Sequence, residues 1–178
     1  MDAIRACRDK YEQRIRLAAA GVPGPAFAAA GTPGEAARAA ARIGFPVVVK
    51  PGAGTGSTAV RRCEDTAEAA DAARQALASD ADPALPPQRL VLVEEYLAGA
   101  EYSAELIDDK VIGITRKRLG AEPYFLETGH DFPASLGAAD AKALGGTAVA
   151  AVRALGLAWG GLMSNSATCR RRSRASWR

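Results

Sequence analysis

A glycine-rich segment directly follows a short apolar run that ends in a lysine. The lysine is Lys50, and the segment consists of Gly52, Ala53, Gly54, Thr55, Gly56 and Ser57. Glycines let the backbone approach an anion closely, so that successive N–H groups can surround phosphate oxygens. The lysine adds a positive charge to the same phosphates. The segment therefore predicts a phosphate-binding loop, and the alternative is a flexible hairpin turn after an edge strand.

Neither of two common glycine-rich phosphate motifs matches this segment. The P-loop requires a Gly-Lys-Ser/Thr sequence, which does not follow here. The dinucleotide fingerprint leads directly into a helix, whereas this segment leads into Ala59-Val-Arg-Arg62. The phosphate-binding interpretation therefore depends on the elements around the segment.

Those elements are a mixture of helices and strands. Thr32, Pro33 and Glu35 form a capping box with proline at the first helical position, and Asp65 begins another helix with Glu68 three residues on. We expect helices over 9–20, 33–42, 65–78 and 138–155, strands over 45–50 and 89–95, a hairpin of 101–107 and 111–117, and a loop over 119–136. This order predicts an α+β fold.

The composition excludes several classes of protein. The chain has 178 residues, of which 48% are hydrophobic, as in an ordinary globular domain. No apolar run is long enough to span a membrane, and the first residues lack the apolar core of a secretion signal. Cys7, Cys63 and Cys169 match neither a disulfide framework nor a zinc site. We therefore expect a cytoplasmic protein with no membrane partner.

The net charge of +3 arises at the C-terminus. Residues 169–178 contain five arginines and no acid, and Asp140 is the last acidic residue of the chain. A basic tail alone does not identify a nucleic-acid-binding protein, and no nucleic-acid motif accompanies it. The alternative of a non-catalytic nucleic-acid-binding protein that uses this tail predicts steeply salt-dependent binding.

The order of several short motifs resembles the ATP-grasp superfamily over about residues 8–160. These motifs are Asp9-Lys10 before a helix, Gly21-Val-Pro-Gly-Pro25 after it, Gly44-Phe-Pro-Val-Val-Val-Lys-Pro51, the glycine-rich segment, and Val93-Glu-Glu-Tyr-Leu-Ala-Gly-Ala-Glu101. Residues 113–118 and 123–133 resemble the branch with biotin-carboxylase-like and L-amino-acid-ligase-like enzymes. The resemblance implies an ATP-grasp fold with a complete lid subdomain and a partial C-terminal core.

The resemblance also implies that ATP is clamped between two α+β subdomains. Lys10 and Lys50 match the two lysines that contact the phosphates, and residues 52–57 match a flap that closes over them. The alternative for Lys10 is a solvated helix lysine. We therefore expect Lys10 and Lys50 to approach the same phosphates from different elements.

The adenine and ribose of ATP are assigned to the next matching motif. Its hinge matches the run of Glu94, Glu95, Tyr96 and Leu97. There Glu95 and Leu97 are expected to contact adenine mainly through backbone groups. Glu101 matches the carboxylate that accepts the ribose hydroxyls. The alternative for Glu94 and Glu95 is an exposed strand end.

The remaining candidates lie near the expected acceptor site. Lys117 is a candidate catalytic contact to a phosphate or acyl-phosphate, and the alternative is an exposed strand lysine. Glu127 and His130 lie where this branch lines the acceptor site, although a lone loop histidine can also be structural. The aromatic residues of this stretch are expected to pack rather than to bind substrate, and they are Tyr124, Phe125 and Phe132.

The resemblance stops near Gly160. The family uses Mg²⁺ held by carboxylates that follow the helix matching 138–155, but residues 158–178 contain no Glu or Asp, so no metal ligand is identified. The family's N-terminal domain has no counterpart either.

We expect four segments: a helix and linker over 1–30, the lid over 31–97, a partial core over 98–160 and a divergent tail over 161–178. A shifted reading frame near codon 160, or a natural domain completed by a partner, accounts for this pattern.

The expected function is part of an ATP-dependent carboxylate–amine ligase that forms an acyl-phosphate, with an amino acid or peptide as substrate. The alternative within enzymes is a biotin-carboxylase-like enzyme that uses bicarbonate. Because the metal ligands are not identified, we expect weak nucleotide binding and little turnover. An apolar face left by missing core strands would favour self-association.

Overall fold

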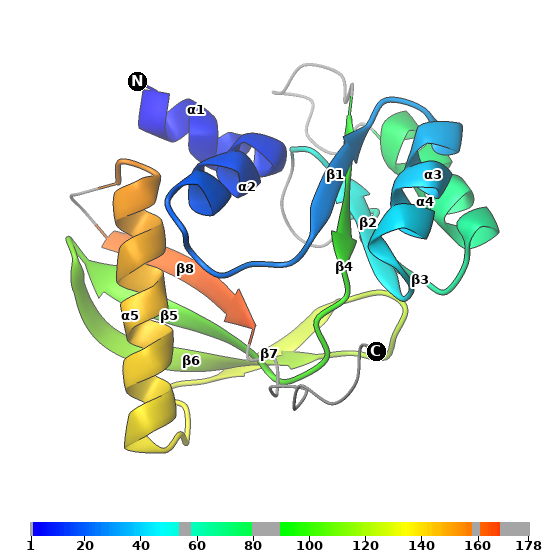
Figure 1. Ribbon diagram of the computed structural model, residues 1–178. Helices are drawn as coiled ribbons and strands as arrows, with labels where there is room; N and C mark the ends of the chain where they lie inside the picture. The colour runs from blue at the N-terminus through cyan, green and yellow to red at the C-terminus, as the bar shows by residue number, and fades with distance from the viewer. Residues whose placement is uncertain (1, 54–57, 80–89, 158–160, 168–178) are drawn as a thin grey trace, which may run out of the picture.

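The computed structural model describes residues 2–53, 58–79, 90–157 and 161–167, and it confirms the α+β class (Figure 1). Its helices are α1 (Asp2–Arg8), α2 (Lys10–Ala19), α3 (Pro33–Ile43), α4 (Thr66–Ala78) and α5 (Ala138–Ala154). Its strands are β1 (Phe27–Ala30), β2 (Val47–Pro51), β3 (Arg61–Cys63), β4 (Val91–Glu95), β5 (Glu101–Ile107), β6 (Lys110–Leu119), β7 (Glu127–Asp131) and β8 (Gly161–Ala167). None of the described helices is both long and apolar enough to cross a membrane.

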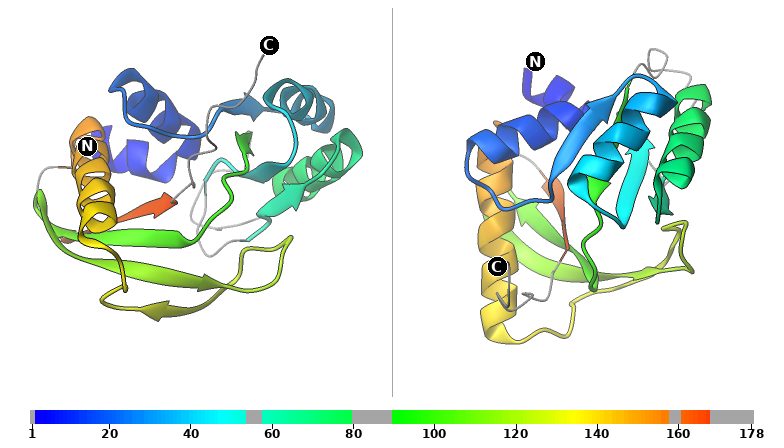
Figure 2. Two further views of the ribbon diagram at one scale, coloured as in Figure 1. Left: turned by 60° about the horizontal axis from the view of Figure 1, so that its bottom comes forward. Right: turned by 45° about the vertical axis from the view of Figure 1, so that its right-hand side comes forward.

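The described strands form two four-stranded sheets. The first has the order β1-β4-β2-β3 and the second has the order β7-β6-β5-β8. All the strand pairs are antiparallel. Figure 2 shows α3 and α4 on the side of the first sheet that faces away from the second sheet. This arrangement leaves the inner face of the first sheet free to contribute to a site.

The core of the first sheet is built from small aliphatic side chains. On β2, Val47 and Val49 are buried against the helices, so Lys50 between Val49 and Pro51 projects from the other face. The helices meet the sheet through alanines, which allow a close approach. The buried alanines of α3 and α4 are Ala36, Ala39, Ala40, Ala69, Ala72, Ala73 and Ala76.

The second sheet has one apolar face and one polar face. Its apolar face packs against α5 through Tyr102, Ala104, Leu106, Ile114, Leu144, Ala148 and Val152. Because side chains alternate along a strand, Glu101, Ser103 and Glu105 of β5 lie on the opposite face. Cross-strand pairing places Thr115 and Lys117 of β6 beside them. A polar surface is therefore built into this sheet.

The predicted helix caps are present. The side chain of Thr32 accepts a hydrogen bond from the Glu35 N–H at 3.2 Å, and the side chain of Asp65 accepts one from the Glu68 N–H at 2.8 Å. Glu35 differs in one detail from a capping box, because its carboxylate accepts the N–H of Gly31 rather than that of the cap residue itself.

One prediction about the elements needs correction, and several elements were not predicted. The expected loop over 119–136 is wrong for Glu127–Asp131, which form β7 against β6. Residues 161–167, which we expected in a divergent tail, form β8 and pair with β5. The helix α1 and the strands β1 and β3 were not predicted. β1 is short and alanine-rich, so it lacks the β-branched pattern that identifies a strand.

Candidate nucleotide-binding site

The first predicted phosphate lysine lies at the beginning of α2. Asp9 caps this helix, because its carboxylate accepts the N–H groups of Tyr11 at 2.9 Å and Glu12 at 3.0 Å. The N–H of Lys10 donates to the carbonyl of Gly52 at 2.8 Å. The helix that presents Lys10 is therefore joined directly to the start of the predicted phosphate loop.

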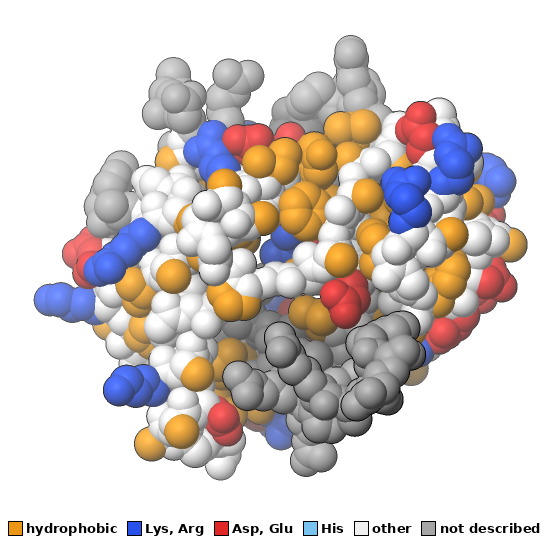
Figure 3. All heavy atoms as spheres, in the orientation of Figure 1, with side chains coloured by type: hydrophobic (Ala, Val, Ile, Leu, Met, Phe, Trp, Pro, Cys, Tyr) orange, Lys and Arg blue, Asp and Glu red, His pale blue; other side chains and the backbone are white. Residues whose placement is uncertain are grey.

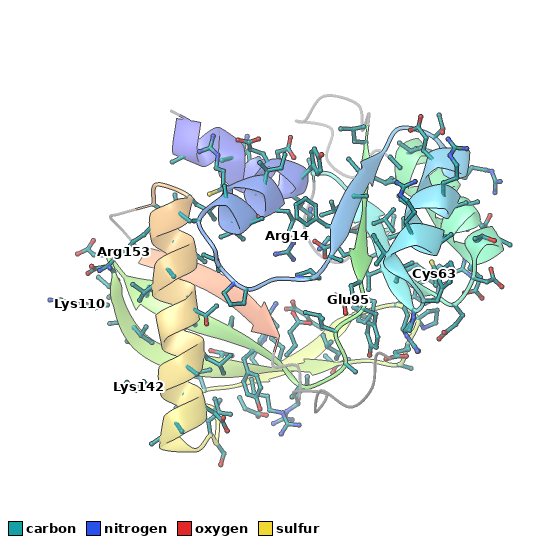
Figure 4. The ribbon with its side chains drawn as sticks, in the orientation of Figure 1. Arg14, Cys63, Glu95, Lys110, Lys142 and Arg153 are labelled. Carbon is teal, nitrogen blue, oxygen red and sulfur yellow. The ribbon has the colours of Figure 1, made fainter. Side chains whose placement is uncertain are left out.

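The second predicted phosphate lysine is paired with a buried carboxylate. Glu94 on β4 is only 5% exposed, and its Oε2 accepts a hydrogen bond from Lys50 Nζ at 2.5 Å. Strand pairing places Glu94 opposite Val48, so Lys50 is its diagonal neighbour on the inner face of the sheet. The other oxygen, Oε1, is paired with Nε of Arg14 from α2. Figure 4 shows Arg14 reaching from α2 toward the first sheet.

The helix α2 is held on this inner face by a second contact. The rings of Tyr11 and Phe27 meet edge to face, with their centroids 6.0 Å apart. Lys10 and Arg14 are four residues apart and therefore lie on one side of the helix. The packing of α2 thus brings two of its cationic side chains to the strand that contains Glu94.

The charges of this cluster influence one another. Burial alone would raise the pKa of Glu94, but Lys50 and Arg14 outweigh that effect and hold the pKa below its ordinary value. Burial lowers the pKa of Lys10, and the nearby positive charge of Lys50 lowers it further. Three cationic side chains thus surround one buried carboxylate. Figure 3 shows basic side chains in a hollow between α2 and the first sheet. Such a cluster suits a polyanion.

The predicted hinge residues follow directly after Glu94. Glu95 is exposed at the end of β4 (Figure 4), and its carboxylate accepts the N–H of Ala26 at 3.2 Å. The alternative of an exposed strand end is therefore wrong for Glu94 and right for the side chain of Glu95. The backbone N–H of Leu97 has no hydrogen-bond partner among the described residues. That N–H remains a candidate donor to a ligand.

Tyr96 connects the hinge to the loop between β6 and β7. Its hydroxyl donates to Glu122 Oε1 at 2.6 Å, which raises the pKa of Tyr96. The guanidinium of Arg62 lies 4.7 Å from the centre of the Tyr96 ring and is also paired with Glu122. Phe125 packs near the same ring, at 6.1 Å between centroids. This cluster fixes the β6–β7 loop against the first sheet.

The acceptor-site candidates form a second ionic cluster. Lys117 is only 6% exposed, so the alternative of an exposed strand lysine is wrong. Its Nζ lies 2.6 Å from Glu127 Oε1 and 3.4 Å from Glu101 Oε1. His130 Nε2 lies 3.1 Å from the other oxygen of Glu127. The hydrogen bond from Lys117 lowers the pKa of Glu127.

The structure thus groups most sequence candidates into two clusters, and it adds one residue. Arg14 was not predicted, because its partner Glu94 is 80 residues away in the sequence and no local pattern connects them. Glu101, expected at the ribose, lies beside Lys117, with its Oε1 3.4 Å from the lysine Nζ. Gly54, Thr55, Gly56 and Ser57, and the arginines of 169–178, lie outside the described residues. Of the expected packing aromatics, Tyr124 and Phe132 are largely exposed and Phe125 is half-buried.

Two curated relatives match most of this chain. An uncharacterized protein, y4rH, from Sinorhizobium fredii is 39% identical over 159 residues, which is 89% of this chain and 33% of that protein. A D-alanine–D-alanine ligase from Alcanivorax borkumensis is 32% identical over 160 residues, which is 85% of this chain and 48% of the ligase. The chain therefore spans about a third to a half of these relatives.

Solved structures show the same fold. An L-amino acid ligase from Bacillus licheniformis superposes with a TM-score of 0.74 at 25% identity, covering 92% of this chain and 37% of the ligase. A biotin carboxylase from Campylobacter jejuni gives the same TM-score at 22% identity, covering 90% of this chain and 37% of the carboxylase. The family model of the ATP-grasp domain matches residues 43–162, which include Lys50, Glu94 and Lys117. The chain therefore belongs to the ATP-grasp family.

Proposed function

We propose that this chain is the ATP-binding part of an ATP-dependent carboxylate–amine ligase, with an amino acid or peptide as substrate. The observation that supports this most strongly is the buried pairing of Glu94 with Lys50 beside Lys10. Two lysines from separate elements meet at the start of a glycine-rich segment, as a triphosphate requires.

The phosphates of ATP are proposed to lie between α2 and the end of β2. Lys10 and Lys50 supply two cationic groups for the phosphates. Gly52 starts the loop whose backbone N–H groups would surround the phosphate oxygens. Because Lys10 N–H holds the carbonyl of Gly52, the loop begins at a fixed distance from the lysine.

The base of ATP is proposed to lie at the hinge. The backbone of Glu95 and Leu97 offers an acceptor and a donor for an adenine edge. The N–H of Tyr96 is used within the fold, since it donates to the carbonyl of Pro46 at 3.1 Å. From the family motif, Glu101 is proposed to accept the ribose hydroxyls. Its carboxylate would then contact both the sugar and Lys117.

The acceptor end is proposed to involve the cluster of Lys117, Glu127 and His130. A buried ammonium with two carboxylates can bind the charged ends of an amino acid: Lys117 attracts the carboxylate, and Glu127 attracts the amine. In the ligase reaction a substrate carboxylate oxygen attacks the γ-phosphorus and ADP leaves. The amine of the second substrate then attacks the acyl carbon, loses a proton, and displaces inorganic phosphate.

Mg²⁺, which the family uses, would offset the negative charge of the phosphates when bound. Among the side chains that the structure describes, no group of three or more His, Cys, Asp or Glu could hold a metal ion. The carboxylates of Glu94, Glu101 and Glu127 are all paired with cationic side chains. The described side chains therefore do not fit a magnesium site, and we assign it no residue.

Equilibrium dialysis of ATP tests the nucleotide site. We expect the chain to bind ATP with modest affinity, similar with and without Mg²⁺. Lys50→Ala should abolish that binding, whereas Arg16→Met should not, because Arg16 pairs with Glu12 on the surface of the same helix. Equal affinity in Lys50→Ala and the unchanged chain would refute the phosphate role of Lys50.

The substrate class can be tested separately, because the chain contains one histidine. The imidazole NMR signals of His130 are therefore unambiguous. If amino acids bind beside Glu127, they should shift these signals in a saturable way, whereas bicarbonate should not. A shift with bicarbonate alone would favour a carboxylating enzyme instead.

A further inference from the structure

The two carboxylate oxygens of Glu94 have different partners. Oε2 accepts from Lys50 on the neighbouring strand at 2.5 Å, and Oε1 is paired with Arg14 on α2. The carboxylate side chain is 7% exposed, the lysine side chain 17% and the arginine side chain 28%. The acid is thus the buried member, and both cations are closer to solvent.

This arrangement matters for any anion that approaches Lys50. Before binding, a hydrogen of the Lys50 ammonium is directed at Glu94. If the ammonium turned to a phosphate and Glu94 had no other partner, a buried carboxylate would remain unpaired, which is strongly unfavourable. With Arg14 in place, Glu94 keeps a partner that is ionised at every relevant pH.

We propose that Arg14 is a positioning residue that retains Glu94 as its ion pair, so that Lys50 can transfer its ammonium from Glu94 to the phosphates of a nucleotide. This proposal rests on the proposed function. It identifies Arg14 as the residue that makes Lys50 available to the phosphates. Lys50 and Arg14 share one carboxylate but have different tasks: Lys50 exchanges partners and Arg14 does not.

The position of Arg14 supports this division. It lies four residues after Lys10 on the same side of α2, and that helix is tied to Gly52 by the Lys10 N–H. The counter-ion of Glu94 therefore lies on the helix that is joined to Gly52. Arg16 on the same helix is different, because its Nε pairs with Glu12 at 2.7 Å within the helix.

The test compares three probes: ATP, inorganic triphosphate and adenosine. In Arg14→Met, Glu94 loses one of its two direct ion pairs, so phosphate binding at Lys50 must break the other. We expect affinity for ATP and for triphosphate to fall about tenfold or more, as for the loss of one charge-assisted hydrogen bond. Affinity for adenosine should not change. Arg16→Met is the matched control and should bind all three probes normally.

The double variant Arg14→Met/Glu94→Gln gives the sharper result. Glutamine needs no counter-ion, so Lys50 is released and triphosphate affinity should return to within about threefold of the unchanged chain. A role of Arg14 in packing alone predicts no such recovery. Glu94→Gln by itself should bind triphosphate at least as tightly as the unchanged chain. Circular dichroism and a thermal unfolding curve establish that each variant is folded.

The outcomes separate the two claims. If the unchanged chain binds ATP no better than Lys50→Ala, the proposed function fails. If Lys50→Ala loses binding but Arg14→Met binds triphosphate normally, the role of Arg14 is refuted. It is also refuted if the double variant is as weak as Arg14→Met, or if Glu94→Gln alone is weakened. Should Arg14→Met not fold, the comparison of Arg14→Met/Glu94→Gln with Glu94→Gln still decides the question, because equal triphosphate affinity is expected only if Arg14 acts through Glu94.

Discussion

Two buried charges of opposite sign organise the two sheets. On the first sheet a carboxylate, Glu94, is paired with the cations Lys50 and Arg14. On the second sheet an ammonium, Lys117, is paired with the carboxylates Glu101 and Glu127. In both clusters the central group is almost inaccessible and its partners reach toward solvent.

The difference in sign supports the proposal that the two clusters bind different ligands. A central acid surrounded by bases presents positive charge outward, which suits phosphates. A central base surrounded by acids presents negative charge outward together with one buried positive group, which suits a molecule that has both an amine and a carboxylate. The geometry of the two sheets therefore agrees with a nucleotide at one cluster and an amino acid at the other.

The largest expected effect comes from removing both cationic partners of Glu94. Arg14→Met/Lys50→Met removes both partners of Glu94 and leaves a buried carboxylate unpaired. We expect the free energy of unfolding to fall by about 3–5 kcal/mol. Urea unfolding followed by circular dichroism measures it. Adding Glu94→Gln should recover most of the loss, and no recovery would show that the double variant acts through packing instead.

Removing both carboxylate partners of Lys117 should have a smaller effect on the free energy of unfolding. Glu101→Gln/Glu127→Gln removes both partners of Lys117, but a lysine can turn its flexible stem so that its ammonium reaches water. We expect a loss of about 1–3 kcal/mol in the same unfolding measurement. Lys117→Met in that background should restore stability. A loss equal to that of the isolated Glu94 would contradict the difference we draw between the two clusters.

The pH dependence of ATP binding shows which of the two clusters binds ATP, and it needs no variant that removes an ion pair. The pKa of Lys10 lies below the ordinary 10.5 because of burial and Lys50, and bound phosphates would favour its charged form. Above the lowered pKa of Lys10, binding must therefore take up a proton, so ATP affinity should fall as pH rises through that pKa toward the ordinary lysine value.

Calorimetry in buffers of different ionisation enthalpy measures the proton uptake. Lys10→Met should bind ATP more weakly and should lose this part of the dependence. An unchanged alkaline dependence in Lys10→Met would assign the proton to another group. Lys117→Met should retain the dependence, because it belongs to the other cluster.

The smallest expected effect is on a thiol of the first sheet. Cys63 is fully buried, and burial raises its pKa to about 11. In a Cys7→Ser/Cys169→Ser chain, we expect alkylation of Cys63 at neutral pH to proceed only as fast as the sheet opens. Reaction at the rate of a free thiol would mean that the first sheet opens readily. The unfolding free energies expected for the variants above would then report local opening rather than unfolding of the whole chain.

The sequence could predict those features that depend on neighbouring residues. Thr32 and Asp65 cap helices through side-chain contacts three residues away, and both were identified. The strand β7 was missed because Glu-Thr-Gly-His-Asp has no apolar alternation; it is an edge strand that pairs only with β6 among the described strands. Arg14 was missed because its role depends on the fold that brings α2 to β4.

The sequence predicted which lysines lie near each other, but it did not predict their ion pairs. Lys10 and Lys50 were placed together through a family motif, and the structure brings them near each other. The side chain of Glu94 had no role in that motif beyond the hinge, yet it is the counter-ion of Lys50. Lys117 could not be recognised as buried, because burial of a lysine depends on two carboxylates from other strands.

Lysine acylation with and without ATP tests the central claim most directly. The chain has five lysines: Lys10, Lys50, Lys110, Lys117 and Lys142. Lys110 and Lys142 lie far from Arg14 in Figure 4 and serve as internal controls, and the buried Lys117 should react slowly in both states. The phosphate site predicts that ATP protects Lys10 and Lys50 while Lys110 and Lys142 react as before. Equal labelling of Lys10 and Lys50 with and without saturating ATP would contradict it.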